Sequence, residues 1–199
     1  TEILPPVTGE KPEKPQSNLS NRGLRETIHT GSFLITFICI YVTGNILLGS
    51  IILLLAVVYT MSELARIRGI NIPILSEITW NAANKTELYE FAPAPIYFAL
   101  GISFSLLFLP EPIGYVAITV LTLGDGGAHI FGMKFGKTPL PFNKGKNVEG
   151  TIVGFMLAFL GAMIFVSPII ALIASAVGML VEGIPSPIND NFTIPFIVG

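Results

Sequence analysis

The sequence predicts an all-α, polytopic integral membrane protein with about six transmembrane helices. Of its 199 residues, 51% are hydrophobic and only 12% are charged, which is about half the charged fraction of a typical soluble domain. Several apolar runs approach the roughly 20 residues that a helix needs to cross a bilayer. These runs do not alternate with period two, as the strands of a membrane β-barrel do, so the predicted spans are helical.

The first residues of the chain differ in composition from all that follows. The stretch TEILPPVTGEKPEKPQSNLS is rich in Pro, Glu, Lys and Ser. A segment of this kind cannot bury enough apolar surface to fold by itself. We therefore expect a flexible or surface-lying N-terminal arm over residues 1–22, and a single membrane domain over residues 23–199.

Six apolar segments follow the arm. The first two, 31–48 and 45–64, are expected to form a hairpin that breaks at Thr43-Gly44-Asn45. The next stretch is too polar to span the membrane and is punctuated by prolines. It is expected to hold a short interfacial helix near 74–84, with Trp80 at the depth of the headgroups. The four remaining spans and a seventh apolar helix at the C-terminus are predicted at 94–109, 113–131, 151–166, 169–181 and the residues before Gly199.

The charged residues are distributed unequally between the two sides of this six-span arrangement. All eleven Lys and Arg residues fall on one side, and Glu111 is the only acidic residue that falls on the other. Positive charge in short loops marks the cytoplasmic side of a membrane protein. The loaded side is therefore predicted to be cytoplasmic.

Asp125 is predicted to lie below the cytoplasmic surface. It precedes Lys134 by nine residues, about 13 Å along a helix. A carboxylate at the bilayer centre costs about 2.5–3.5 kcal/mol on insertion scales, and less nearer the interface, so Asp125 needs a partner or a function. It is either a helix-packing or ion-pair residue or, as we favour, a ligand of a divalent metal ion. The small residues around it at 124–128 allow close helix packing or the close approach of ligand phosphates.

A basic loop follows at residues 134–149. It contains Lys137, Lys144 and Lys146, and Pro139 and Pro141 prevent a continuous helix. Lysines in this place can simply anchor the protein at the cytoplasmic surface. Beside a buried acid, they also suit a polyphosphate that carries Mg²⁺, because this ion is typically bound by one or two carboxylates together with phosphate oxygens.

These residues carry a resemblance to a known family. The pattern GDxxAxxxGxxxGK from Gly124, followed by KxxEG from Lys146, resembles the signature of the CTP-dependent lipid-alcohol kinases, which include dolichol kinase, phytol kinase and the CTP-dependent diacylglycerol kinase. LRETIHTG at 24–31 and VEGIPSPINDNFTIP at 181–195 resemble two further elements of this family. The chain departs from the family pattern at Glu26, Asn147 and Asn189.

The resemblance implies a reaction, a cofactor and a set of site residues. The reaction is transfer of the terminal phosphate of CTP to the hydroxyl of a polyprenol-, phytol- or diacylglycerol-like lipid at the cytoplasmic face. CTP is the co-substrate, and Mg²⁺ or another divalent cation is the cofactor. Asp125 would bind the metal ion together with Glu149 or Asp190. The catalytic candidates are Asp125, His29 and Asp190, and the general base is expected among His29, His129 and Asp190.

Two further groups of residues are assigned by their place in the matched segments or, for Glu63 and Arg66, at the end of the second predicted span. The first group is expected to bind nucleotide and phosphate and comprises Gly124, Gly132, Gly136, Lys137, Lys146, Glu149 and Asn191. The second is expected to support the site and comprises Arg25, Glu63, Arg66, His129 and Glu182. Arg25 and His29 share a helix face, and Glu63 with Arg66 is interpreted mainly as a structural pair.

Two other functions are compatible with parts of this pattern. Phosphatidate cytidylyltransferases, which make a CDP-activated lipid, have a related Asp…KxxEG pattern. A small cation or solute transporter is the alternative of another class, but it predicts charges along a transmembrane path, and the outer half of each predicted span is uncharged. The expected partners are a lipid alcohol, a nucleoside triphosphate, the bilayer of a cell or endoplasmic-reticulum-type membrane and a second copy of the chain, but no nucleic acid.

Overall fold

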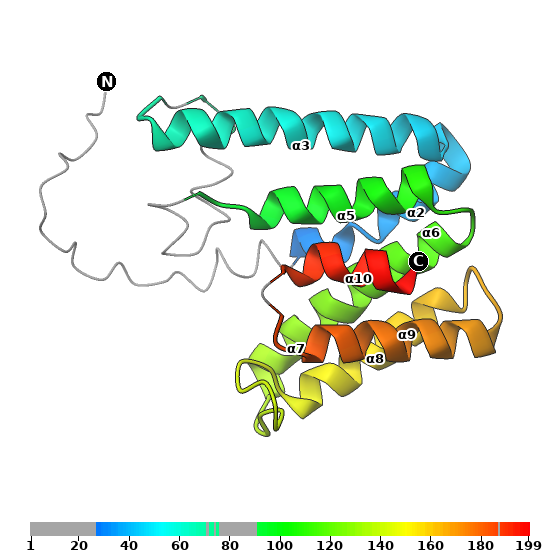
Figure 1. Cartoon of the computed structure of the whole chain (residues 1–199). Coiled ribbons are helices and arrows are strands. Elements are labelled where there is room, and N and C mark those ends of the chain that lie inside the picture. The colour runs from blue at the N-terminus through cyan, green and yellow to red at the C-terminus, as the bar shows by residue number, and fades with distance from the viewer. Residues whose placement is uncertain (1–26, 71, 74, 76–90, 187) are drawn as a thin grey trace, which may run out of the picture.

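The computed structural model in Figure 1 describes residues 27–70, 72–73, 75, 91–186 and 188–199. Within these ranges the regular structure is helical, and the one β-type pairing is an isolated bridge between Pro139 and Asn147. The predicted all-α class is confirmed. The predicted arm at 1–22, Arg25, and the interfacial helix at 74–84 with Trp80 lie outside the described residues.

The first two helices form the predicted hairpin. Residues 27–31, α2 (Leu34–Ile38) and the π turn η1 (Cys39–Thr43) make one apolar segment, and α3 (Asn45–Ile67) follows. Gly44 separates them with φ +75°, a conformation that glycine adopts without steric cost. The predicted break at 43–45 is confirmed, but the first helix ends at Thr43 instead of residue 48, because this turn reverses the chain there.

The remaining helices lie close to the predicted segments. A long helix is built from α6 (Ile113–Thr119), the π turn η2 (Val120–Asp125) and α7 (Gly126–Phe135), and it extends four residues beyond the predicted end at 131. A proline occupies one of the first two positions of both α5 and α9, where its missing N–H costs nothing. The other four helices are α5 (Ala94–Phe108), α8 (Val148–Ala162), α9 (Pro168–Gly183) and α10 (Asp190–Val198).

The long helix Ile113–Phe135 is the centre of the bundle. Ile118, Val120 and Leu121 are fully buried in it. Figure 1 shows α3 along the outer side of α5, with α8 and α9 on the opposite side of the molecule and α10 between α5 and α9. In the most apolar 18-residue stretch of α3, only 17% is buried inside the protein, whereas 67% of the corresponding stretch of the central helix is buried. α3 therefore presents most of its apolar surface outward.

Among the residues that the structure describes, two helices, Asn45–Ile67 and Ile113–Phe135, are long and apolar enough to cross a membrane by length and composition. Four further apolar helices are shorter, with 10–17 residues: Thr27–Thr43, Ala94–Phe108, Val148–Ala162 and Pro168–Gly183. Each of the six predicted spans thus corresponds to an apolar helix.

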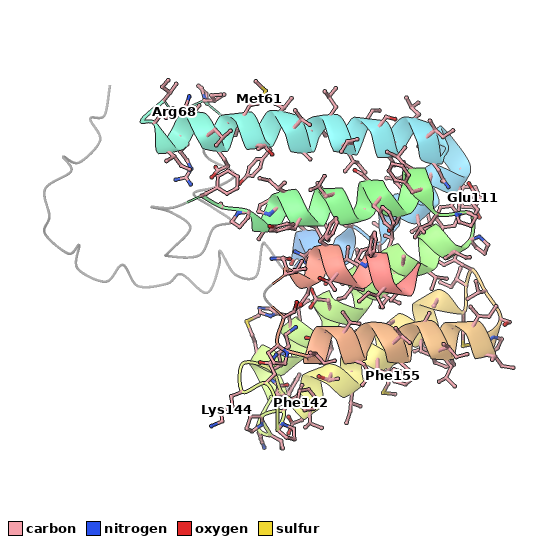
Figure 2. The ribbon with its side chains drawn as sticks, viewed as in Figure 1. Met61, Arg68, Glu111, Phe142, Lys144 and Phe155 are labelled. Atoms are coloured by element: carbon pink, nitrogen blue, oxygen red, sulfur yellow. The ribbon has the colours of Figure 1, made fainter. Side chains whose placement is uncertain are left out.

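Charged side chains mark one end of the bundle. Figure 2 shows Arg68, at the end of α3, and Lys144, in the loop after α7, at the same end, with Glu111 at the opposite end. Because successive helices run in alternating directions (Figure 1), the charged end gathers the end of α3, the end of α7 and the start of α10.

Candidate active site

Lys146 lies at the centre of a group of three carboxylates. Its Nζ is 2.6 Å from Asp190 Oδ2, 2.7 Å from Glu182 Oε1 and 4.0 Å from Asp125 Oδ1. We call these four residues the lysine–carboxylate cluster. The side chains are between 5% and 27% exposed, so the cluster is largely enclosed by the fold.

The three acids of the cluster come from three different helix ends, and the lysine comes from a loop. Asp125 ends η2, Glu182 is in the last turn of α9 and Asp190 begins α10. The loop between α7 and α8 supplies Lys146, and the loop is closed by hydrogen bonds from Leu140 N to Lys146 O and from Lys146 N to Asn143 O. Pro139 and Pro141 keep this loop non-helical, as predicted. The loop can therefore fold back over the helix ends.

The cluster carries an excess of negative charge. Three carboxylates and one ammonium leave two formal negative charges when all four groups are ionised. Burial acts to lower the pKa of Lys146, but the charges of Asp125 and Glu182 and the hydrogen bonds to the carboxylates outweigh it, so this pKa is raised above its usual value. Lys146 therefore stays protonated and holds the acidic groups together.

The donor chemistry of the cluster fits a hard divalent cation. Mg²⁺ prefers carboxylate oxygens and completes its shell with water and phosphate. Glu182 Oε2 is buried and has no hydrogen-bond partner among the described residues, and a buried acceptor of this kind is costly unless a ligand satisfies it. Within the part of the chain that the structure describes, no group of three or more His, Cys, Asp or Glu side chains is arranged as a ready metal site. The cluster would therefore offer one or two carboxylates to such an ion and leave the rest of its shell to water or a ligand.

His29 joins the cluster from the first helix. Its Nε2 is 3.6 Å from Asp125 Oδ2 and 3.1 Å from the carbonyl oxygen of Leu121. The imidazole packs against Phe98 of α5, with ring centroids 4.4 Å apart. The structure thus brings together five residues that the sequence analysis assigned to the site: His29, Asp125, Lys146, Glu182 and Asp190.

Glu149 has different partners from Asp125. Its carboxylate accepts hydrogen bonds from the backbone N–H groups of Lys137 and Thr138 and from the Thr138 hydroxyl, at 2.9–3.2 Å. Its own backbone N–H, followed by those of Thr138 and Lys137, lowers the pKa of Glu149 to about 2. In this structure Glu149 ties the start of the basic loop to α8. Its assignment to metal and phosphate binding stays a prediction.

The glycines expected to bind phosphate face protein atoms. A Cβ at Gly124 would meet Ala158 and Met179, and one at Gly132 or Gly136 would meet the side chain of Asn147. The absence of a side chain is therefore required by packing between α7, α8 and α9. Their role toward a nucleotide stays a prediction, as does that of Lys137, whose backbone N–H bonds Glu149.

The residues expected to support the site differ in burial and in their partners. Glu63 is fully buried, and both of its oxygens accept from Arg66, at 3.0 and 2.8 Å. Glu63 Oε2 also accepts from Ala92 N at 3.2 Å, so this pair joins the end of α3 to the start of α5. Asn191 is buried in the first turn of α10, and His129 is exposed on α7.

Curated relatives give an independent comparison. A probable chloroplastic phytol kinase 2 from Glycine max is 32% identical over 55% of this chain and 44% of its own length. The chloroplastic phytol kinase 1 of Arabidopsis thaliana is 27% identical over 65% of this chain and 49% of its own. The predicted resemblance to lipid-alcohol kinases is confirmed. A chloroplastic farnesol kinase of Arabidopsis thaliana is 30% identical over 53% of this chain and 40% of its own.

The comparison covers part of each relative. The chain spans about half the length of the phytol kinases that it matches. No protein-family model matches the chain. No solved structure matches it significantly. The similarity to kinases therefore rests on the aligned sequences alone.

Sequence reasoning missed two features of this site. Asn147, noted only as a departure from the family pattern, caps α8 by accepting from Gly150 N at 2.8 Å and donates to Gly132 O of α7 at 3.2 Å. An Asn just before an apolar helical run is a recognisable start signal. The π turn η2, which ends at Asp125, has no such signal in the sequence.

Proposed function

We propose that this chain is a CTP-dependent kinase that phosphorylates the hydroxyl of a membrane lipid alcohol. The observation that carries the proposal is the lysine–carboxylate cluster, in which Lys146 and Asp125, both parts of the kinase-like motif, meet Asp190 of the C-terminal motif. The relatives named above, phytol kinases and a farnesol kinase, support a prenyl-type alcohol as acceptor.

The membrane setting is part of the proposal. The six predicted spans, each carried by one apolar helix, are six membrane crossings, and the outward surface of α3 meets lipid. Ile46, Leu54 and Met61 on this helix are 77%, 63% and 65% exposed, and such a surface is unfavourable in water. The shorter helices cross because they pack against the long ones and because flanking residues reach the interface.

The charged end of the bundle is the cytoplasmic end in this proposal. Arg68 and Lys144 lie at that end in Figure 2, and Glu111 lies at the other. An asymmetry of Lys and Arg sets the orientation of membrane proteins. The cluster then faces cytosolic CTP, while the neighbouring apolar helices give a lipid hydroxyl access from the bilayer.

Phosphoryl transfer depends mainly on positioning and on neutralising charge. In the proposed reaction, Lys146 and Lys137 bind phosphate oxygens, and Asp125 would hold Mg²⁺ together with a second carboxylate. The bound ion would neutralise charge on the phosphates. The alcohol oxygen bonds to the terminal phosphorus, the bond from this phosphorus to the CDP oxygen breaks, and CDP leaves. Asp190, the most exposed acid of the cluster, takes the hydroxyl proton.

The test is incubation of the purified protein with γ-labelled CTP or ATP and a panel of phytol, farnesol, dolichol and diacylglycerol. The proposal predicts labelled lipid phosphate, CDP as the second product and a preference for CTP. A cytidylyltransferase would instead release pyrophosphate and form a CDP-lipid from a lipid phosphate. The absence of labelled lipid with every alcohol, from protein that elutes as a single folded species, would contradict the kinase assignment.

A further inference from the structure

We infer that His29 is a positioning residue, which holds Asp125 and the π turn η2 in place through its Nε2–H, and that it is not the general base through this nitrogen. The inference rests on the proposed kinase function, because it assigns a role within that reaction. Three observations carry it: the two acceptors that face Nε2, the register change in the helix at Asp125 and the packing of the ring.

The neighbours of Nε2 determine where the proton is. Nε2 lies 3.1 Å from the Leu121 carbonyl oxygen and 3.6 Å from Asp125 Oδ2. A carbonyl oxygen and an ionised carboxylate only accept hydrogen bonds. Nε2 therefore carries the proton, as the neutral Nε2–H tautomer or as imidazolium. In either form this nitrogen has no lone pair with which to take a proton from the lipid hydroxyl.

The backbone that presents Asp125 is irregular. η2 is a π turn over Val120–Asp125, and the next residue, Gly126, donates its N–H to Leu123 O, three residues back. The helix thus changes its hydrogen-bond register at Asp125. π turns replace the regular i→i−4 ladder with longer steps and are frequent at functional sites. The bond from His29 to Leu121 O fixes a carbonyl inside this turn from a segment 92 residues away.

The ring itself has little freedom to move. His29 is 12% exposed and packs on Phe98 of α5. Asp125 in turn lies between two groups, with His29 near Oδ2 and Lys146 near Oδ1. Removing the His29 donor would release one side of the carboxylate and the turn that carries it. A misplacement of about 1 Å at a reacting centre can cost about 100-fold in rate.

Two substitutions separate a positioning role from a base. His29→Gln keeps an N–H donor near the position of Nε2 but has no basic ring nitrogen. His29→Phe keeps a ring against Phe98 but has no donor. We expect His29→Gln to retain kcat within about threefold and His29→Phe to lose about 100-fold in kcat, with KM for the nucleotide little changed in both. A loss in His29→Gln as large as that in His29→Phe would overturn the inference.

A second measurement does not depend on activity. The chain has two histidines, so ¹⁵N-histidine labelling of the His129→Gln variant reports His29 alone. A long-range ¹H–¹⁵N spectrum at neutral pH is expected to show a protonated Nε2. A proton on Nδ1 only, with Nε2 bare, would overturn the inference even if the protein proved to be an active kinase. Absence of transfer in the wild type would instead refute the proposed function and leave the result on the tautomer intact.

Discussion

Asp125 and Glu149 are both acids of the kinase-like motif, but the fold gives them different surroundings. Asp125 faces a lysine and a histidine from distant segments. Glu149 is hydrogen-bonded to backbone N–H groups of the adjacent loop. The first arrangement leaves a carboxylate within a charged cluster, and the second uses a carboxylate to close a loop. At the residue scale, the two acids of the motif therefore serve different purposes.

The loop-closing role of Glu149 predicts a pH dependence of stability. Glu149 precedes the predicted fifth span, and its pKa is lowered to about 2 in the folded protein, below the usual value of about 4.3. Its contribution is thus present above the unfolded pKa and is lost as the pH falls toward 2. Glu149→Gln is expected to lower the thermal unfolding midpoint in detergent at pH 7, and the difference from wild type is expected to shrink at pH 4 and pH 3. A difference that does not change with pH would contradict this role.

The composition of the cluster was partly predictable. Asp125, Lys146 and Asp190 were assigned to one site because the segments that contain them resemble motifs of the lipid-alcohol kinases. Glu182 was assigned only a supporting role, yet its Oε1 is 2.7 Å from Lys146. The side of the membrane follows from the order of the spans, but the contact depends on how α9 is rotated, and a single sequence does not encode that directly.

Helix boundaries were predicted within a few residues where apolar runs end at prolines or glycines, as at Gly44 and Pro168. The π turns η1 and η2 were not predicted, because both interrupt apolar runs without a sequence signal of their own. At the element scale, the close packing of α7 on α8 is the feature that presents Asp125 and the basic loop to one another. Glycines on both helices make this packing possible.

Gly150 gives a direct test of this helix contact. A Cβ at Gly150 would collide with the backbone oxygen of Ala128 in α7, whereas a Cβ at Gly31 would meet nothing within 4 Å. Gly150→Ala is expected to destabilise the protein by about 1–3 kcal/mol, as overpacking usually does. Gly31→Ala, the matched control in another helix, is expected to be neutral or slightly stabilising. Equal unfolding midpoints for the two variants in detergent would contradict the close packing.

The arrangement of the whole molecule separates an end with basic side chains from the end that carries Glu111. The sequence predicted this separation from the positions of Lys and Arg alone, and Arg68, Lys144 and Glu111 have the expected placement in Figure 2. The orientation in a membrane is a further step. It follows from general rules of insertion.

Cysteine labelling tests the orientation. The buried Cys39 is replaced by Ala, and a single cysteine is introduced as Lys144→Cys or Glu111→Cys. A membrane-impermeant maleimide added to intact cells is expected to label the Glu111→Cys protein. The Lys144→Cys protein is expected to react only after the membrane is opened. Labelling of both positions from the same side, or the reverse pattern, would contradict the proposed topology.

The central claim is that the cluster around Asp125 and Lys146 transfers phosphate, and the rate of the Asp125→Asn variant tests it most directly. The initial rate of label transfer from γ-labelled CTP to the preferred alcohol is compared with that of Glu111→Gln, an acid at the opposite end. Loss of a metal ligand removes several kcal/mol of charge stabilisation. The account predicts at least about a 100-fold loss for Asp125→Asn, with unchanged gel-filtration behaviour and an unaffected Glu111→Gln. A near-normal rate in folded Asp125→Asn protein would contradict it.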